Sequence, residues 1–176
     1  YRPLLTGVNF IEFNKDSDLK KINEKTAAVL LETIQGGAGF IEPEDNYLKK
    51  VKVRCSEVGA LLILDEIQPG FGRTGKMFGF EKYGVSPDIV VMGKALGGGL
   101  PIGAFSASSS LMKKLELNPK LGHITTFGGN PVIAASALAT LKEIDDSEII
   151  NKIADKEKLF REHLVNPKIK KIQGKG

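Results

Sequence analysis

The sequence predicts an α/β fold of three layers, in which helices cover a mainly parallel sheet on both faces. Two apolar runs, at residues 61–64 and 89–92, have the length and composition of strands buried inside a parallel sheet. A helix pattern lies between an earlier strand-like run, at 26–33, and the first of these two runs. Strand, helix and strand in succession form a right-handed crossover that makes the strands parallel. The 176 residues are enough for about one domain with a core of its own.

The first half of the chain alternates short helices and strands. We expect, in order, an extended run at 8–13, a short helix from about 16 to 24, a buried strand at 26–33, a glycine-rich turn at 35–39 and a helix at 43–58. Pro43 suits the start of the last of these helices, and Gly59 suits the residue that ends it. Its apolar residues recur every three or four positions and predict one face turned to a core.

The second half adds a third short strand and three further helices. The expected elements are a helical turn at 78–83, the strand at 89–92, a strand at 103–107, and helices at 108–115, 131–144 and 148–164. Asn130 and Pro131 suit the cap and the first residue of the helix at 131–144. Small residues in that helix allow another segment to pack closely against it.

Composition excludes several classes of function. The net charge is +4, but lysines and glutamates are interspersed and no basic cluster is interleaved with aromatic residues, so we expect no nucleic-acid partner. No apolar run approaches the roughly 18 residues that a membrane span needs, and the first residues do not resemble a signal peptide. Cys55 is the single cysteine, which predicts a reducing, cytoplasmic location.

An acid and an amine follow the two apolar runs. Asp65 comes directly after the first run, and Lys94 follows the second, just before three glycines. Ligands of open α/β sheets bind beyond the carboxyl ends of the strands, so both side chains are expected at one crevice. A partly desolvated lysine there has a lowered pKa and can form Schiff bases with carbonyls. Asp65 can hold a ring nitrogen protonated, although a capping role, or a metal site shared with Glu66, explains it equally well.

A second loop, at residues 125–130, has features of an anion site. It offers two threonine hydroxyls, backbone N–H groups and the beginning of a helix, although such a loop is more often only a turn. A nucleotide-binding module that uses the glycines at 97–99 is an alternative. The chain lacks a P-loop or a G-x-G-x-x-G motif after a strand, which counts against that alternative.

Three long motifs together resemble one family. LLILDEIQPGFGRTG, SPDIVVMGKALGGGLPIGA and HITTFGGNP, in this order and with similar spacing, resemble the class III (ω-amino-acid type) aminotransferases, which include acetylornithine, ornithine and 4-aminobutyrate aminotransferases. The resemblance runs from about Pro3 to Leu141. It implies a transferase of fold type I that depends on pyridoxal 5′-phosphate (PLP). Such an enzyme moves an amino group from an ω-amino acid or amine donor to a 2-oxo acid such as 2-oxoglutarate.

The resemblance also implies roles for single residues. Lys94 forms the Schiff base with PLP and moves the proton between the substrate carbon that bears the amine and the cofactor. Asp65 binds the pyridine nitrogen, Ile67 packs under the ring and Gln68 contacts the phenolic oxygen. Thr126 reaches the phosphate of the neighbouring subunit's cofactor, which implies a homodimer with its site at the interface. Glu32 lies near cofactor and substrate, or is a paired structural carboxylate.

Several positions depart from the family pattern. The family segment E-P-x-Q-G-E-G-G reads ETIQGGAG here, so Gly37 replaces a glutamate that governs substrate recognition. Pro69 replaces a threonine, and His123 is expected to orient a loop rather than to transfer protons. An aminomutase or a decarboxylase on the same scaffold is an alternative, although Gln68 argues against the semialdehyde aminomutases.

The length of the chain also bears on its activity. Members of the family are more than twice as long, so we expect residues 1–176 to be the central portion of the PLP-binding large domain. The N-terminal segment and the C-terminal small domain are then absent. We therefore expect an isolated chain of this length to be inactive.

Overall fold

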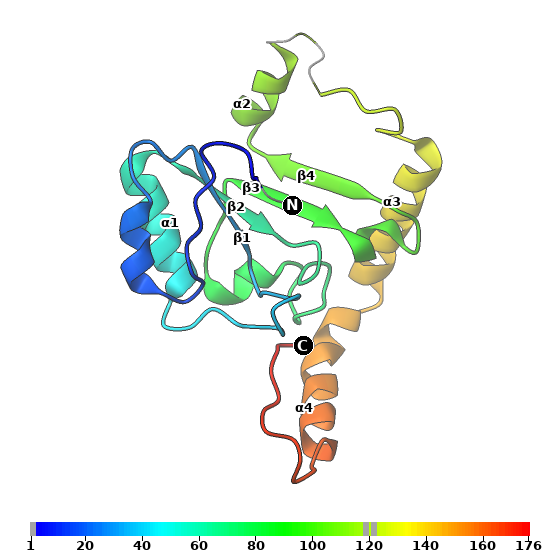
Figure 1. The fold of residues 1–176 in the computed structure, drawn as a ribbon. Coiled ribbons are helices and arrows are strands. Elements are labelled where there is room, and N and C mark those ends of the chain that lie inside the picture. The colour runs from blue at the N-terminus through cyan, green and yellow to red at the C-terminus, as the bar shows by residue number, and fades with distance from the viewer. Residues whose placement is uncertain (1–2, 118–119, 121–122) are drawn as a thin grey trace.

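The structure is a computed structural model that describes residues 3–117, 120 and 123–176. A four-stranded sheet is flanked by helices (Figure 1). Its strands, in spatial order, are β1 (Ala28–Glu32), β2 (Leu61–Asp65), β3 (Ile89–Gly93) and β4 (Gly103–Ala107). The first three strands are parallel, and β4 is antiparallel to β3. The predicted α/β class with a mainly parallel sheet is therefore confirmed.

Helix α1 (Tyr47–Val58) connects β1 to β2 and covers the sheet. Side chains of a strand point alternately to its two faces, and in β2 Leu62 and Leu64 are fully buried while their neighbours are only half-buried. The two leucines pack in one cluster with Val51 and Cys55 of α1. Burying a leucine contributes about 1.5–3 kcal/mol, so this contact fixes the helix on the sheet.

The start of α1 differs from the prediction. The helix begins at Tyr47 and not at Pro43. Asp45 and Asn46 have φ values of 45° and 61°, which belong to the left-handed region and cannot continue into a right-handed helix. The end of the helix is as predicted, because Gly59 adopts φ 75° and its N–H donates to the carbonyl of Cys55.

Helix α3 (Pro131–Asp146) packs against the short 3-10 helix η3 (Lys94–Gly97) that follows β3. Asn130 caps α3, as predicted, by accepting hydrogen bonds from two amides of its first turn. Ser136 Oγ donates to the carbonyl of Gly97 at 2.8 Å. A Cβ at Gly98 would lie 2.2 Å from Thr140 Oγ1, so the close contact requires glycine there. The small residues of α3 thus bring η3 against the helix.

The remaining elements are short. They are η1 (Asp16–Lys21), η2 (Gly79–Tyr83), α2 (Ser109–Met112), η4 (Lys113–Glu116), η5 (Ile149–Lys152) and α4 (Ile153–His163). The helices predicted at 108–115 and 148–164 are therefore each split into an α and a 3-10 part. Strand β1 is shorter than predicted and lies at the sheet edge, where Leu30 is 64% exposed, so its expected burial on both faces is wrong. Within the described residues, every helix is too short or too polar to cross a membrane.

Candidate active site

The carboxyl ends of β1, β2 and β3 place three predicted site residues at one edge of the sheet. Glu32 and Asp65 are the last residues of their strands and are direct neighbours across the β1–β2 ladder. Lys94 follows the last residue of β3. Parallel strands end on the same side of a sheet, so this arrangement is the one that the sequence predicts.

Lys94 contacts the turn that follows Asp65. Its Nζ donates a hydrogen bond to Oε1 of Gln68 at 2.5 Å. The backbone of Lys94 has φ 44°, in the left-handed region, which costs a non-glycine residue about 1–2 kcal/mol and is common at functional sites. The side chain is exposed, so the predicted desolvation of the amine is wrong for the chain described here.

Asp65 and Ile67 belong to the same turn as Gln68, the residue that accepts the hydrogen bond from Lys94. Oδ1 of Asp65 accepts from the amide of Ile67 at 2.8 Å, which fixes the half-buried carboxylate in a tight turn. A Cβ at Gly93 would lie 3.5 Å from both Cγ atoms of Ile67, so this side chain lies against the residue that precedes Lys94. An acid, an amine, an amide and an aliphatic side chain therefore gather within one turn and one strand end.

Glu32 approaches the same turn through the loop after β1. Its Oε2 accepts from the amide of Gly36 at 2.9 Å. A Cβ at Gly36 would come within 3.2 Å of Gln68 Cδ and 3.4 Å of Glu32 Oε2. Glycine at position 36 thus lets the β1 loop lie against Gln68, and Glu32 belongs to the site by position.

Glu66 is a residue of this turn to which the sequence assigned no role beyond a possible metal site. Its side chain is completely buried, and its carboxylate accepts from Thr33 Oγ1, from Gly79 N at 2.7 Å and from Phe80 N at 3.0 Å. Burial raises the pKa of this carboxyl, and the three hydrogen bonds oppose the rise. Because both oxygens are engaged by protein donors, a metal site shared with Asp65 is not supported. Alternation along β2 gives the missed signal, since position 66 continues the buried series of Leu62 and Leu64.

Thr126 lies apart from this network. It is in an exposed turn, and no hydrogen bond between described residues joins it to the other predicted site residues. Asn130 already occupies the amides of Val132 and Ile133, so the beginning of α3 does not offer these amides to an anion as expected. His123 packs its ring edge-on against Phe105 at 5.2 Å between centroids, in line with an orienting role.

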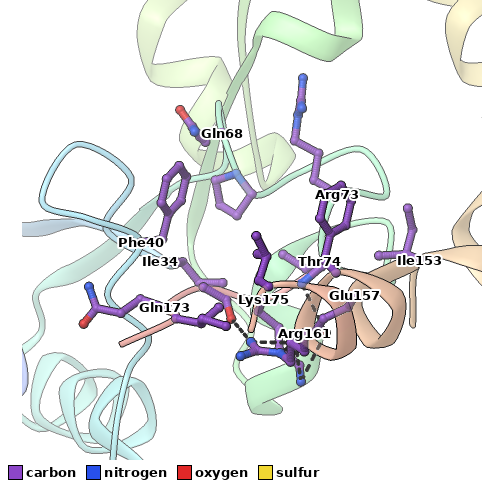
Figure 2. Close-up of a pocket in the computed structure, with 16 residues that line it drawn as sticks. Ile34, Phe40, Gln68, Arg73, Thr74, Ile153, Glu157, Arg161, Gln173 and Lys175 are labelled. Carbon is purple, nitrogen blue, oxygen red and sulfur yellow. Dashed lines mark hydrogen bonds and ion pairs between the residues drawn. The ribbon is translucent and has the colours of Figure 1, made fainter. Parts of the chain in front are cut away.

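A cavity of about 540 Å³ lies on another side of the turn, between Arg73, Thr74 and the C-terminal part of the chain (Figure 2). Gln68 lies at its margin, whereas Asp65 and Lys94 do not line it. Three of its charged lining residues are paired with one another, since Glu157 forms ion pairs with Arg161 at 2.9 Å and with Lys175 at 3.5 Å. The cavity therefore shares Gln68 with the gathered side chains but does not include the acid or the amine.

The sequence profile of the family described as Aminotransferase class-III matches residues 9–176. The chain belongs to the class III aminotransferase family. Its sequence is 51% identical to a putrescine aminotransferase of Pectobacterium atrosepticum, over 82% of this chain and 32% of that protein. It is 43% identical to an ornithine aminotransferase of Oceanobacillus iheyensis, over 100% of this chain and 45% of that protein.

A solved ornithine aminotransferase of Toxoplasma gondii ME49 has the same fold. The TM-score is 0.90 at 32% identity, over 99% of this chain and 43% of that structure. This class III chain thus spans less than half the length of the relatives that it matches. A nucleotide-binding module is not supported by this family membership.

Class III aminotransferases depend on PLP, and another structure of the Toxoplasma gondii enzyme has partial occupancy of PLP at its active site. The gathered residues of this family member fit such a group. Lys94 offers a primary amine for an aldehyde, and Asp65 offers a carboxylate for a protonated ring nitrogen. Ile67 offers an apolar surface and Gln68 an amide beside them.

Proposed function

We propose that the protein is a PLP-dependent aminotransferase that moves an amino group from an ω-amino acid or amine donor to a 2-oxo acid such as 2-oxoglutarate. The hydrogen bond between Lys94 and Gln68, beside Asp65 at the adjacent strand end, is the observation that carries this proposal. Membership of the class III family supports it. We take residues 1–176 to be the central portion of the PLP-binding large domain.

Each residue of the turn has one task in this function. PLP, when bound, supplies an electron sink for the substrate carbon that bears the amine. Asp65 keeps a proton on the ring nitrogen, and Ile67 and Gln68 orient the ring from the turn that also fixes Asp65. Lys94 Nζ holds the cofactor, and it takes up and returns a proton at the substrate carbon. Gln68 Oε1 directs this amine through the hydrogen bond of 2.5 Å.

The phosphate of the cofactor is assigned to a neighbouring subunit. Thr126 lies in an exposed loop beside Phe127, which is 80% exposed, and Ile124, which is 70% exposed. Apolar side chains this exposed favour a protein contact. We propose a homodimer in which Thr126 binds the phosphate of the partner's cofactor. The single cysteine, buried and free, supports a cytoplasmic location.

The identity of the amine donor is the part of the proposal that the residues of the site restrict least. The relatives above are named for putrescine and ornithine, and further relatives are named acetylornithine aminotransferases. We propose a donor with an amino group on a terminal carbon, with acetylornithine-like amines as the first to be tested. Glu32 lies near the substrate in this proposal, whereas Gly37 leaves its loop without the carboxylate that the family pattern has there.

Absorbance spectroscopy with PLP tests the proposal. The purified full-length protein, of which we take residues 1–176 to be the central portion, should develop a visible absorbance band with PLP, and Lys94→Ala should lose it, because Lys94 supplies the amine directly after β3. Lys25→Ala, at an exposed lysine outside the site, is the control and should keep the band. A screen of amine donors against 2-oxoglutarate then identifies the substrate. If Lys94→Ala kept both the band and transamination, the assignment would be wrong.

A further inference from the structure

The carboxylate of Glu66 joins three separate segments under the turn that carries the site. Thr33, directly after β1, donates its hydroxyl to Oε1, and the amide of Phe80 in η2 donates to the same oxygen at 3.0 Å. The amide of Gly79 donates to Oε2 at 2.7 Å. A Cβ at Gly79 would lie 3.3 Å from both carboxylate oxygens, so glycine allows this approach. Glu66 therefore binds the end of β1 and the beginning of η2 at once.

The backbone of Glu66 is held as firmly as its side chain. Its N–H donates to the carbonyl of Val91 in β3 at 2.9 Å, and its carbonyl accepts from Gly70 at 3.0 Å. Asp65 precedes Glu66, and Ile67 and Gln68 follow it. Thr33 also donates its own amide to the carbonyl of Asp65 at 3.4 Å. Thr33 is thus bonded to the turn twice, once at the backbone and once at the side chain.

The side-chain contact matters because the carboxylate has no cation beside it. None of the ion pairs found among residues 3–117, 120 and 123–176 includes Glu66. A buried charge without a counter-ion depends on its hydrogen bonds. Thr33 supplies the only side-chain donor of the three, so a substitution can remove this bond without disturbing the backbone.

We propose that Thr33 and Glu66 are positioning residues that fix the turn of Asp65, Ile67 and Gln68 in the orientation that PLP requires. Neither side chain is placed against the cofactor, and both act through the turn. The inference rests on the proposed function, since it assigns the turn to the cofactor. It adds two residues to the site, and Thr33 stands where the family segment E-P-x-Q-G-E-G-G has a proline, which has no hydroxyl to donate.

The test compares two buried threonines. Thr33→Val removes the donating hydroxyl and keeps the shape of the side chain. Thr74→Val is the matched control, because Thr74 is 2% exposed and its hydroxyl has no hydrogen-bond partner among the described residues. Thr33→Ser restores a hydroxyl at position 33. If Thr33→Val does not fold, Thr33→Ala removes the same hydroxyl with less crowding and takes its place.

Two measurements are made on each variant. Amide hydrogen exchange without cofactor reports whether Ile67, Gly79 and Phe80 are held, and PLP titration followed by visible absorbance reports the affinity. Thr33→Val should exchange these amides about tenfold faster and bind PLP about tenfold more weakly, as expected for losing one hydrogen bond to a charged acceptor. Thr33→Ser and Thr74→Val should remain within about twofold of the unaltered protein.

The outcomes separate the inference from the proposed function. If the unaltered protein develops no absorbance band with PLP, the proposed function fails, and the positioning role fails with it. If the unaltered protein binds PLP and Thr33→Val binds it as tightly as Thr74→Val, only the positioning role is overturned. Faster exchange in Thr33→Val with unchanged PLP affinity also overturns it, because the contact then serves the fold alone.

Discussion

The turn at residues 65–68 and the loop at residues 123–129 are both assigned to one cofactor, but they are built in opposite ways. The turn is bonded to β1, β3, η2 and Lys94 by hydrogen bonds of its own chain. The loop is exposed from residue 123 onward, and its Thr126 has no hydrogen bond to the other site residues that the structure describes. The turn is thus held by its own chain, whereas the other site residues that the structure describes do not hold Thr126.

The topology explains the difference. Residues 65–68 extend a central strand, so neighbouring strands and the segments after them surround the turn on several sides. Residues 123–129 precede α3, and Asn130 satisfies the amides of that helix from within the loop. The turn is therefore held from several sides, whereas residues 123–129 remain exposed.

Substitution of Asp65 gives the largest expected effect on the turn. Asp65→Asn removes the charge that keeps the ring nitrogen protonated, and we expect turnover with any accepted donor to fall about 10²–10³-fold. The comparison is sharpened by Thr126→Ala, which should weaken PLP binding and leave the proton chemistry intact. Steady-state kinetics at saturating PLP measure the turnover of each variant, and PLP titration followed by visible absorbance measures its affinity for PLP. Equal losses of turnover in the two variants would contradict the division of tasks.

Substitution of Glu66 tests how much the contacts of the turn contribute to the free energy of unfolding. Glu66→Ala leaves three buried donors without an acceptor, so we expect the free energy of unfolding to fall by about 3 kcal/mol. Thr126→Ala changes an exposed side chain and should alter it by less than about 0.5 kcal/mol. Denaturant unfolding followed by circular dichroism measures the two values. A Glu66→Ala protein as stable as Thr126→Ala would show that the turn is not held through this carboxylate.

The pH dependence of stability gives a smaller effect at the same residue. Burial raises the pKa of Glu66 above its ordinary value of 4.5, so its stabilising contribution is present below pH 4.5 and is lost as the pH rises through the folded-state pKa. Glu66→Gln removes this titration and should flatten the decline of stability above pH 4.5. Unfolding curves recorded at several pH values measure the slope. Glu24→Gln, at an exposed position, is the control and should keep the slope of the unaltered protein.

Two adjacent glycines give the smallest expected effect. A Cβ at Gly37 would meet no atom within 4 Å, so Gly37→Glu should change the free energy of unfolding by about 0.5 kcal/mol or less. Gly36→Ala should lower the free energy of unfolding more than Gly37→Glu does, because its Cβ would lie 3.2 Å from Gln68 Cδ. We expect Gly37→Glu to shift donor preference, which a donor screen measures. An unchanged preference would remove position 37 from substrate recognition.

The sequence located the central residues because strand ends are readable from apolar runs. Asp65 and Lys94 could be placed at one edge without coordinates, as the parallel ladder from β1 to β3 shows. The contact between Lys94 and Gln68 joins residues 26 positions apart, and no local pattern predicts such a pairing. Glu66 could be predicted only in part. Alternation along β2 indicates that its side chain is buried, but not which three groups donate hydrogen bonds to it.

The start of α1, the burial of β1 and the exposure of Lys94 differ from the prediction, each for a local reason. The start of α1 was placed too early because Asp45 and Asn46 adopt left-handed backbone conformations that composition does not reveal. Burial of β1 was overestimated because a run of apolar residues does not tell an edge strand from a central one. The expected desolvation of Lys94 rests on placing the amine in a crevice at the strand end, whereas its side chain is exposed in the chain described here.

The backbone of Lys94 sets a limit on how this protein can vary. Its left-handed φ of 44° is one that glycine adopts freely and lysine does not. If stability alone were selected, glycine would therefore be favoured over lysine at position 94, although the proposed chemistry depends on this lysine. Under the proposed function, the lysine is kept here for its amine at the expense of a strained backbone.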